Sequence, residues 1–183
     1  MRVVTREQVV RGGCRYFVRR GTIDMDALAA SLAISRATLY RVVRARDAVL
    51  GDVLWLLGDD LLARARRERR RTGVDGVLEV TRRFAVLLRD AEPFRAFLRA
   101  EPGTAARVLF HPSGGVHRRA VLAQRDILLE NRTESWAPSD PEQLAYLYVR
   151  IVESFLYADL LGGTEVAFTH AERAARALLT GRS

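Results

Sequence analysis

The stretch from Asp24 to Asp47 constrains the fold of this chain more than any other segment. It predicts two short helices joined by a tight turn at Ala33 and Ile34, because apolar residues recur at helical spacing on both sides of the turn. Ser35 is a natural N-cap for the second helix, since its hydroxyl can accept a hydrogen bond from a backbone amide in the first turn. A unit of this kind places its second helix in the major groove of DNA.

One side of this second helix is suited to reading DNA. Leu39, Val42 and Val43 follow the spacing of a buried side, which leaves small residues, a hydroxyl, an aromatic ring and guanidiniums facing outward. Such a surface fits a groove lined with base edges and phosphates. The predicted base-edge contacts are Arg36, Ala37, Thr38 and Tyr40, and the predicted phosphate contacts are Thr22, Ser35, Arg41, Arg44 and Arg46.

The distribution of charge also indicates double-stranded DNA as a partner. Residues 1–46 contain ten arginines and three acidic residues, which is +7 of the net charge of +8. The rest of the chain is therefore almost neutral. A positive charge concentrated in one quarter of the sequence is typical of a surface that binds a polyanion.

The region from Cys14 to Leu50 resembles the N-terminal domain of the TetR family of ligand-responsive transcriptional regulators. The resemblance rests on Phe17, Gly21, Asp26, Leu28, Ala29, Ile34, Ser35, Ala37, Thr38, Leu39, Tyr40, Arg46, Asp47, Val49 and Leu50. It implies three N-terminal helices, of which the third reads DNA, and a fourth that leads to a ligand-binding, dimerising body. Two positions depart from the family pattern. Ala33 replaces the usual turn glycine, at a cost of about 1 kcal/mol if its backbone is left-handed, and Val43 replaces an aromatic residue.

We therefore predict an all-α protein with a helix-turn-helix DNA-binding domain at residues 1–46 and a helical ligand-binding and dimerisation domain at residues 47–183. The five prolines fall between or at the start of the helices expected in the second domain, where proline is tolerated. The last two helices are expected to build a four-helix interface in a homodimer. The expected helices span residues 5–20, 46–71, 75–90, 93–100, 104–110, 115–131, 140–161 and 165–179, besides the two of the helix-turn-helix unit.

Aromatic side chains with a few polar neighbours in the second domain predict a pocket for a small apolar ligand. Arg150 and Glu153 are three residues apart and are expected to pair on one helical face. Residues 101–163 also resemble the C-terminal domain of the QsdR-type subgroup of TetR-like regulators, in the runs VLFHPSGGVH and YVRIVESFLYADLL. That resemblance implies a lactone or related acyl compound as effector. The candidate ligand-binding residues are Phe84, Leu88, Phe97, Phe110, His117, Trp136, Tyr148, Glu153 and Tyr157.

No enzyme, cofactor or metal site is expected. His111 and His117 have no cysteine or carboxylate neighbours, and common catalytic and phosphate-binding motifs are missing. Cys14 is the only cysteine, and no apolar run approaches membrane-spanning length, so we expect a cytoplasmic protein without membrane contact. Two alternatives stay open at this point: a helical small-molecule-binding module without DNA function, and a helical enzyme.

Six arginines follow closely at the end of the predicted long helix, at positions 64, 66, 67, 69, 70 and 71. The sequence favours a solvated helix end here, because the long helix separates these residues from the predicted DNA-reading helix. A second nucleic-acid contact is the alternative interpretation.

Overall fold

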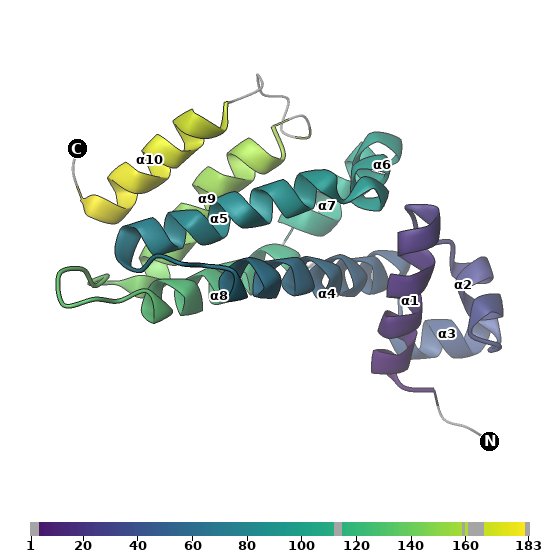
Figure 1. Ribbon diagram of the computed structural model, residues 1–183. Coiled ribbons are helices and arrows are strands. Elements are labelled where there is room, and N and C mark those ends of the chain that lie inside the picture. The colour runs from purple at the N-terminus through teal and green to yellow at the C-terminus, as the bar shows by residue number, and fades with distance from the viewer. Residues whose placement is uncertain (1–3, 112–114, 159, 161–166, 182–183) are drawn as a thin grey trace. The chain divides into compact units, whose positions relative to one another are not determined.

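A computed structural model of the chain describes residues 4–111, 115–158, 160 and 167–181. Within these residues the protein is all-α, as predicted, and the only β-type pairing is an isolated bridge between Thr133 and Trp136. No helix in this part of the chain is long and apolar enough to cross a membrane. The helices are α1 (Arg6–Arg20), α2 (Met25–Ser31), α3 (Arg36–Val43), α4 (Arg46–Arg67), α5 (Gly73–Asp90), α6 (Glu92–Ala100), α7 (Pro102–Phe110), α8 (Val116–Glu130), α9 (Pro141–Leu156) and α10 (Phe168–Thr180) (Figure 1).

Two predicted helix ends were wrong. The long helix α4 ends at Arg67, not at residue 71, and the chain then forms a loop that leads into α5. The carboxylate of Glu79 captures this loop by accepting hydrogen bonds from the backbone amides of Arg70 (3.0 Å) and Arg71 (2.9 Å). Helix α9 ends at Leu156 and a turn follows, whereas the expected helix ran to residue 161, which lies outside the described residues. The expected start of the last helix, at residue 165, also lies outside them.

The chain divides into two compact units. Unit 1 comprises residues 1–60 and 89–117, and unit 2 comprises residues 61–88 and 118–183. Residues 47–60 and 89–117, which we assigned to the second domain, therefore pack within the same unit as the helix-turn-helix segment. Each unit has its own buried core.

The core of unit 1 joins helices that are distant in the sequence. Phe17 of α1 and Phe97 of α6 are almost completely buried and meet edge to face, with ring centroids 5.7 Å apart. Val49, Leu50 and Val53 of α4 are fully buried in the same unit. Burial of such side chains stabilises the unit by roughly 1.5–3 kcal/mol each relative to an exposed position.

Two glycines of α1 allow its neighbours to approach closely. A Cβ atom at Gly12 would lie 2.4 Å from a methyl group of Leu32, and one at Gly13 would lie 2.7 Å from a methyl group of Val53. Both distances are shorter than carbon atoms tolerate. The pair Gly12-Gly13 therefore weakens the intrinsic helix propensity of α1 but permits its packing against the helix-turn-helix unit and α4.

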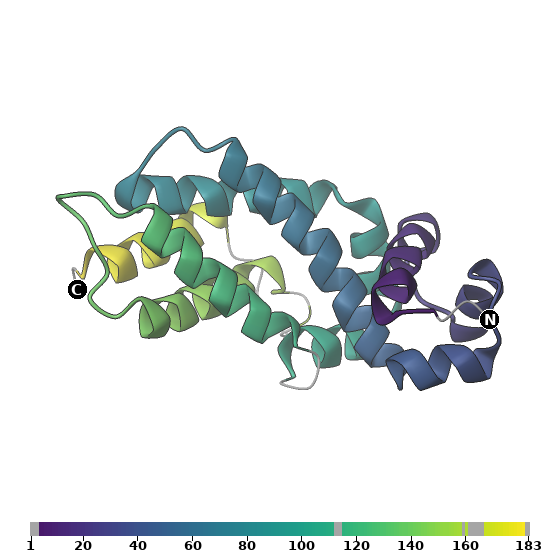
Figure 2. The ribbon, with the colours of Figure 1, turned by 90° about the horizontal axis from the view of Figure 1, so that it is seen from below.

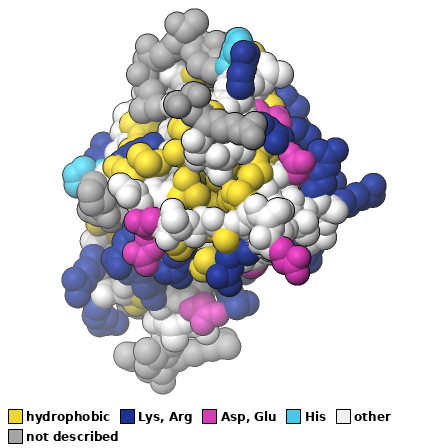
Figure 3. Space-filling model, turned by 90° about the vertical axis from the view of Figure 1, so that its left-hand side faces the viewer, with side chains coloured by type: hydrophobic (Ala, Val, Ile, Leu, Met, Phe, Trp, Pro, Cys, Tyr) yellow, Lys and Arg dark blue, Asp and Glu magenta, His cyan; other side chains and the backbone are white. Residues whose placement is uncertain are grey.

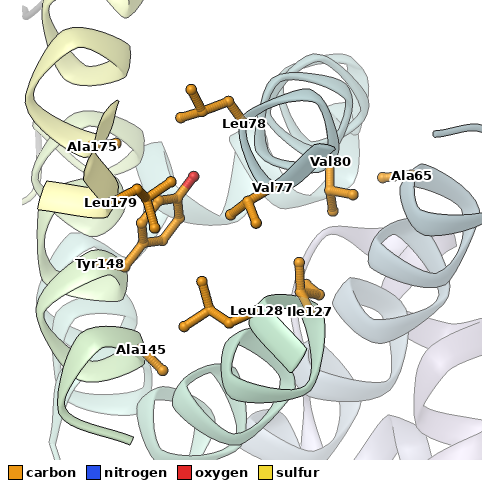
Figure 4. Close-up of a cluster of buried hydrophobic side chains, with 10 residues drawn as sticks. All are labelled: Ala65, Val77, Leu78, Val80, Ile127, Leu128, Ala145, Tyr148, Ala175 and Leu179. Atoms are coloured by element: carbon orange, nitrogen blue, oxygen red, sulfur yellow. The ribbon is translucent and has the colours of Figure 1, made fainter. Parts of the chain in front are cut away.

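The core of unit 2 is formed by five helices. Figure 4 shows its buried side chains, which come from α4, α5, α8, α9 and α10. Tyr148 of α9 is completely buried among them, and its hydroxyl forms a 2.7 Å hydrogen bond with the hydroxyl of Thr81 on α5. Helices α9 and α10 pack side by side (Figure 2), and Trp136 Nε1 donates to the carbonyl oxygen of Leu179 near the end of α10 (2.9 Å). These contacts hold α5, α9 and α10 together.

Candidate nucleic-acid interface

The turn between α2 and α3 is set by two caps and one left-handed residue. The Asp24 carboxylate caps α2 by accepting from the amides of Asp26 (3.0 Å) and Ala27 (2.8 Å). Ala33 has a φ of 54°, which lies in the left-handed region that favours glycine. The Ile34 amide donates back to a carbonyl oxygen of α2, so the chain reverses direction within a few residues.

Helix α3 begins at the predicted cap. The Ser35 Oγ accepts from the backbone amide of Thr38 at 3.1 Å, and the hydroxyls of the two residues lie 2.9 Å apart. Leu39 and Val43 are completely buried, as their spacing predicted, whereas Val42 is only half-buried. The helix is therefore anchored through Leu39 and Val43, and Val42 lies at the border of its buried side.

The predicted reading residues lie together on the opposite side of α3. Arg36, Ala37 and Arg41 are exposed, and Thr38 and Tyr40 are half-buried. Neither Arg41 nor the exposed Arg44, which directly follows the helix, forms an ion pair within the part of the chain that the structure describes. Their positive charge is thus available to an external anion.

Arg36 is held between two neighbours. Its Nη1 atom lies 3.0 Å from a carboxylate oxygen of Asp26 on α2, and its guanidinium carbon lies 5.4 Å from the centre of the Tyr40 ring. The side chains of Arg36 and Asp26 are both 63% exposed. An ion pair as exposed as this contributes little to stability, so Arg36 can exchange Asp26 for a base or a phosphate at little cost.

Arg44 has a strained backbone at the junction of α3 and α4. Its φ of 65° and ψ of −47°, together with a 2.7 Å hydrogen bond from the Ala45 amide to the Val43 carbonyl, define the rarer of the two γ-turn forms. A non-glycine residue in such a conformation costs on the order of 1–3 kcal/mol. The strain is located at an exposed cation beside the reading helix.

Two further predicted phosphate contacts, Thr22 and Arg46, point into unit 1. Arg46 donates to the Ile23 carbonyl (2.6 Å), the Thr22 hydroxyl (2.9 Å) and a carboxylate oxygen of Glu101 (2.7 Å). The hydrogen bond from Arg46 is the largest cause that lowers the pKa of Glu101, and Thr22 donates to the same oxygen. The geometry gives this pair a structural role, and their contact with phosphate stays a prediction.

Glu101 was missed from the sequence because it lies 55 residues away from Arg46. It is the residue between α6 and α7, so its ion pair ties these helices to the start of α4. A second ion pair, between Arg107 of α7 and Asp47 of α4 (2.7 Å), adds to this connection. The α6–α7 segment is therefore fastened to the helix-turn-helix unit within unit 1. No short-range sequence signal could have identified these pairs.

The candidate ligand residues are divided between the two units. Phe97 is part of the core of unit 1. Phe110 and His117 belong to the same unit. The other six lie in unit 2, where Tyr148 is fully buried in the core. The structure thus does not gather all nine residues within one unit. The six in unit 2 are Phe84, Leu88, Trp136, Tyr148, Glu153 and Tyr157.

A small hollow lies between α5, α9 and α10 of unit 2. It is lined by Tyr148, Phe155, Phe168 and Glu172 among others, and its empty volume, including space open to solvent, is about 270 Å³. Tyr148 is the only one of the nine candidate ligand residues among those that line this hollow.

The predicted pair on α9 is present. Arg150 Nη1 lies 3.1 Å from a carboxylate oxygen of Glu153, which is buried. Burial, and to a smaller extent the charge of Glu153, raise the pKa of Tyr157 above its ordinary value. Elsewhere in the described part of the chain, no group of three or more His, Cys, Asp or Glu side chains is placed to hold a metal ion.

Comparisons with known proteins identify relatives of the fold. A family model described as "Tetracyclin repressor-like, C-terminal domain" matches residues 72–180. The solved structure of the transcriptional repressor QsdR of R. erythropolis, from the TetR family, is 26% identical, with a TM-score of 0.86 over 96% of this chain and 94% of that chain. The TetR family regulator PfmR from Thermus thermophilus is 18% identical, with a TM-score of 0.42 over 96% and 99% of the two chains. A search of curated proteins found no match.

Proposed function

Because this chain belongs to the TetR family of transcriptional regulators, we propose that it is a repressor that binds palindromic operator DNA as a homodimer and is released by a small effector. The main support is the exposed side of α3. It offers the unpaired cation Arg41, the readily released Arg36 and the phenol of Tyr40 on a helix that is fixed from behind by buried Leu39 and Val43. A rigid helix with such a surface fits a major groove.

We place the homodimer interface on α9 and α10. Tyr146 and Leu147 of α9 are 45% and 42% exposed, which is unusual for such large apolar side chains. A second copy of the chain would cover them if the two α9–α10 pairs formed a four-helix bundle. In a symmetric dimer the two α3 helices would then meet successive major grooves of a palindromic site.

We place the effector, a small apolar or lactone-like molecule, in unit 2. The protonated hydroxyl of Tyr157 is a donor suited to a carbonyl oxygen, and the buried Glu153 lies near it. Effector binding can release DNA only if the effector prefers the conformation that binds DNA weakly. In that conformation α4, whose residues belong to both units, would tilt, and the two reading helices of the dimer would lose their spacing.

The decisive experiment is selection of bound fragments from random duplex DNA at near-physiological salt. A repressor of this type should enrich a palindrome whose half-sites are about 10 base pairs apart, centre to centre, or a multiple of that spacing. Affinity for the selected duplex should fall steeply with salt, because phosphate contacts release counterions. Failure to enrich any sequence, together with no salt-dependent affinity for duplex DNA, would instead favour a small-molecule-binding module without DNA function.

Arg44→Gly is expected to weaken DNA binding without destabilising the protein. Glycine relieves the backbone strain at φ 65°, and this gain offsets the added entropy of the unfolded chain, so the free energy of unfolding should stay equal or rise by about 1 kcal/mol. Duplex affinity should fall because a phosphate contact is lost. The slope of log affinity against log salt concentration should decrease by about 1.

Arg44→Gln is the matched control for this variant. It removes the charge but keeps the strained backbone, so it should bind duplex DNA as weakly as Arg44→Gly without the gain in stability. Urea unfolding and fluorescence anisotropy over a range of salt concentrations measure the two effects. Unchanged duplex affinity in both variants would show that Arg44 makes no phosphate contact.

A further inference from the structure

A second group of exposed arginines lies at the end of α4, in unit 2. We call residues 67–71 the basic loop; Arg67, Arg70 and Arg71 are exposed, and Arg69 is half-buried. Figure 3 shows arginine side chains at the borders of the molecular face seen from the left of Figure 1. This group is separate from the reading helix, because these arginines belong to unit 2 and α3 belongs to unit 1.

Most other arginines of unit 2 are neutralised by a carboxylate. Arg64 pairs with Glu68 (2.8 Å) and Arg66 pairs with Glu130. The same holds on α5 and α10, where the ion pairs are Arg82–Glu172 (2.7 Å) and Arg176–Asp75 (2.7 Å). Among the described residues, by contrast, the exposed arginines of the basic loop form no ion pair, although the charge of Arg67 helps to lower the pKa of the neighbouring Glu68. Their charge is thus directed to solvent.

The backbone of the basic loop is held in place by Glu79. One carboxylate oxygen accepts from the amides of Arg70 and Arg71, and the other accepts from Arg83 (2.8 Å). Burial of Glu79 opposes ionisation, but these hydrogen bonds lower its pKa to about 2. The carboxylate is therefore ionised at neutral pH, and the hydrogen bonds that it accepts persist over the physiological pH range.

A further hydrogen bond connects the start of α5, just after the basic loop, to the end of α8. The Gly73 amide donates to the Asn131 carbonyl (2.9 Å). This brings the exposed Arg132 to the same end of the unit. The guanidiniums are thus presented from a fixed backbone, which lowers the entropy cost of binding an anion.

The surroundings of the basic loop favour phosphates over an acidic peptide. Specific peptide binding relies on buried apolar anchors, and none of the large exposed apolar side chains of the described residues, at positions 18, 86, 122, 146 and 147, belongs to the basic loop. Arginines and threonine hydroxyls, such as that of the exposed Thr72, are typical phosphate contacts and need no apolar anchor.

We propose that the basic loop, together with Arg132, is a second and sequence-independent contact for the phosphates of duplex DNA, separate from α3. The sequence alone favoured a solvated helix end. The hydrogen bonds that Glu79 and Asn131 accept change that interpretation, because they hold in place the backbone that carries these exposed cations. Such a contact would add to the affinity for duplex DNA of any sequence.

The test uses the full chain with the reading surface disabled by R36A, R41A and R44A. In this background we compare R67Q/R70Q/R71Q with R89Q/R95Q/R118Q, a control that removes the same charge from exposed arginines elsewhere. The probe is a random-sequence duplex, measured by fluorescence anisotropy at salt concentrations from about 50 to about 200 mM, the range over which phosphate contacts weaken most visibly. Far-UV circular dichroism checks that each variant is folded.

The basic-loop variant is expected to lose about tenfold in duplex affinity at the lowest salt, with the salt slope reduced by about 3, one for each lost phosphate contact. The control should change neither quantity by as much. Equal effects of the two variants would overturn the proposal. The proposal would also be overturned if polyglutamate bound the basic loop and duplex DNA did not, because this result would identify an acidic protein as the partner. The outcome does not depend on whether α3 recognises an operator.

Discussion

Arg36→Ala is expected to lower affinity for the selected operator by about tenfold to a hundredfold, with little change in affinity for unrelated duplexes. A bidentate contact from Arg to a guanine edge contributes about 1–3 kcal/mol of discrimination. Arg36 is free to make one, because its ion pair with Asp26 is highly exposed and its guanidinium lies over the Tyr40 ring. Fluorescence anisotropy with the operator and its single-base variants measures the effect.

Arg41→Ala is the matched control for Arg36→Ala. Both residues are exposed on α3, so neither substitution should change the free energy of unfolding by more than about 0.5 kcal/mol. As a phosphate contact, Arg41 should contribute equally to operator and random duplex. An equal loss on both duplexes for Arg36→Ala would reassign Arg36 to phosphate, and an unchanged operator affinity would remove it from the reading surface.

Gly76→Ala is expected to destabilise the protein by about 3 kcal/mol or more. A Cβ atom at this position would lie 2.1 Å from the Asn131 side-chain oxygen and 2.6 Å from the backbone carbonyl oxygen of Arg71. Asn131 is completely buried and donates to the Ile127 carbonyl (2.7 Å), so it has no room to move. Overpacking of this kind typically costs about 1–3 kcal/mol, and a backbone obstacle leaves little possibility of relaxation. Urea unfolding followed by circular dichroism gives the free energy.

Gly58→Ala is the control for Gly76→Ala. Gly58 lies within α4, and a Cβ atom there would meet no atom within 4 Å. Alanine has the higher helix propensity, so this variant should be more stable by up to about 1 kcal/mol. If Gly76→Ala proved as stable as the unsubstituted protein, the start of α5 would be able to move without loss of stability. The backbone of the basic loop would then be held less tightly than we describe.

Local features of the sequence were sufficient to predict the helix-turn-helix unit. The Ser35 cap and the buried Leu39 are both encoded within a few residues of one another. The same holds for the opening helix, whose capping box joins Thr5 and Gln8. Such signals act over one or two helical turns, so they predict the same local structure in most tertiary contexts.

The candidate ligand-binding residues show that composition alone does not predict a binding pocket. The sequence marks aromatic side chains but does not indicate which of them face a pocket. Phe97 and Tyr148 are both completely buried, and they pack in the cores of different units. Burial depends on which helices meet, and helical spacing alone does not determine this.

The sequence by itself determined the all-α fold, the helix-turn-helix unit and the exposed cations of α3, because these depend on short-range spacing and capping. Only the tertiary structure decided that α4 ends at Arg67 and that Arg46 pairs with Glu101. The arginine run after Arg64 has good helix propensity, and what stops it is a carboxylate eight or nine residues further on that captures two amides. Pairings between distant residues form only once the helices have packed, so their partners cannot be read from local pattern.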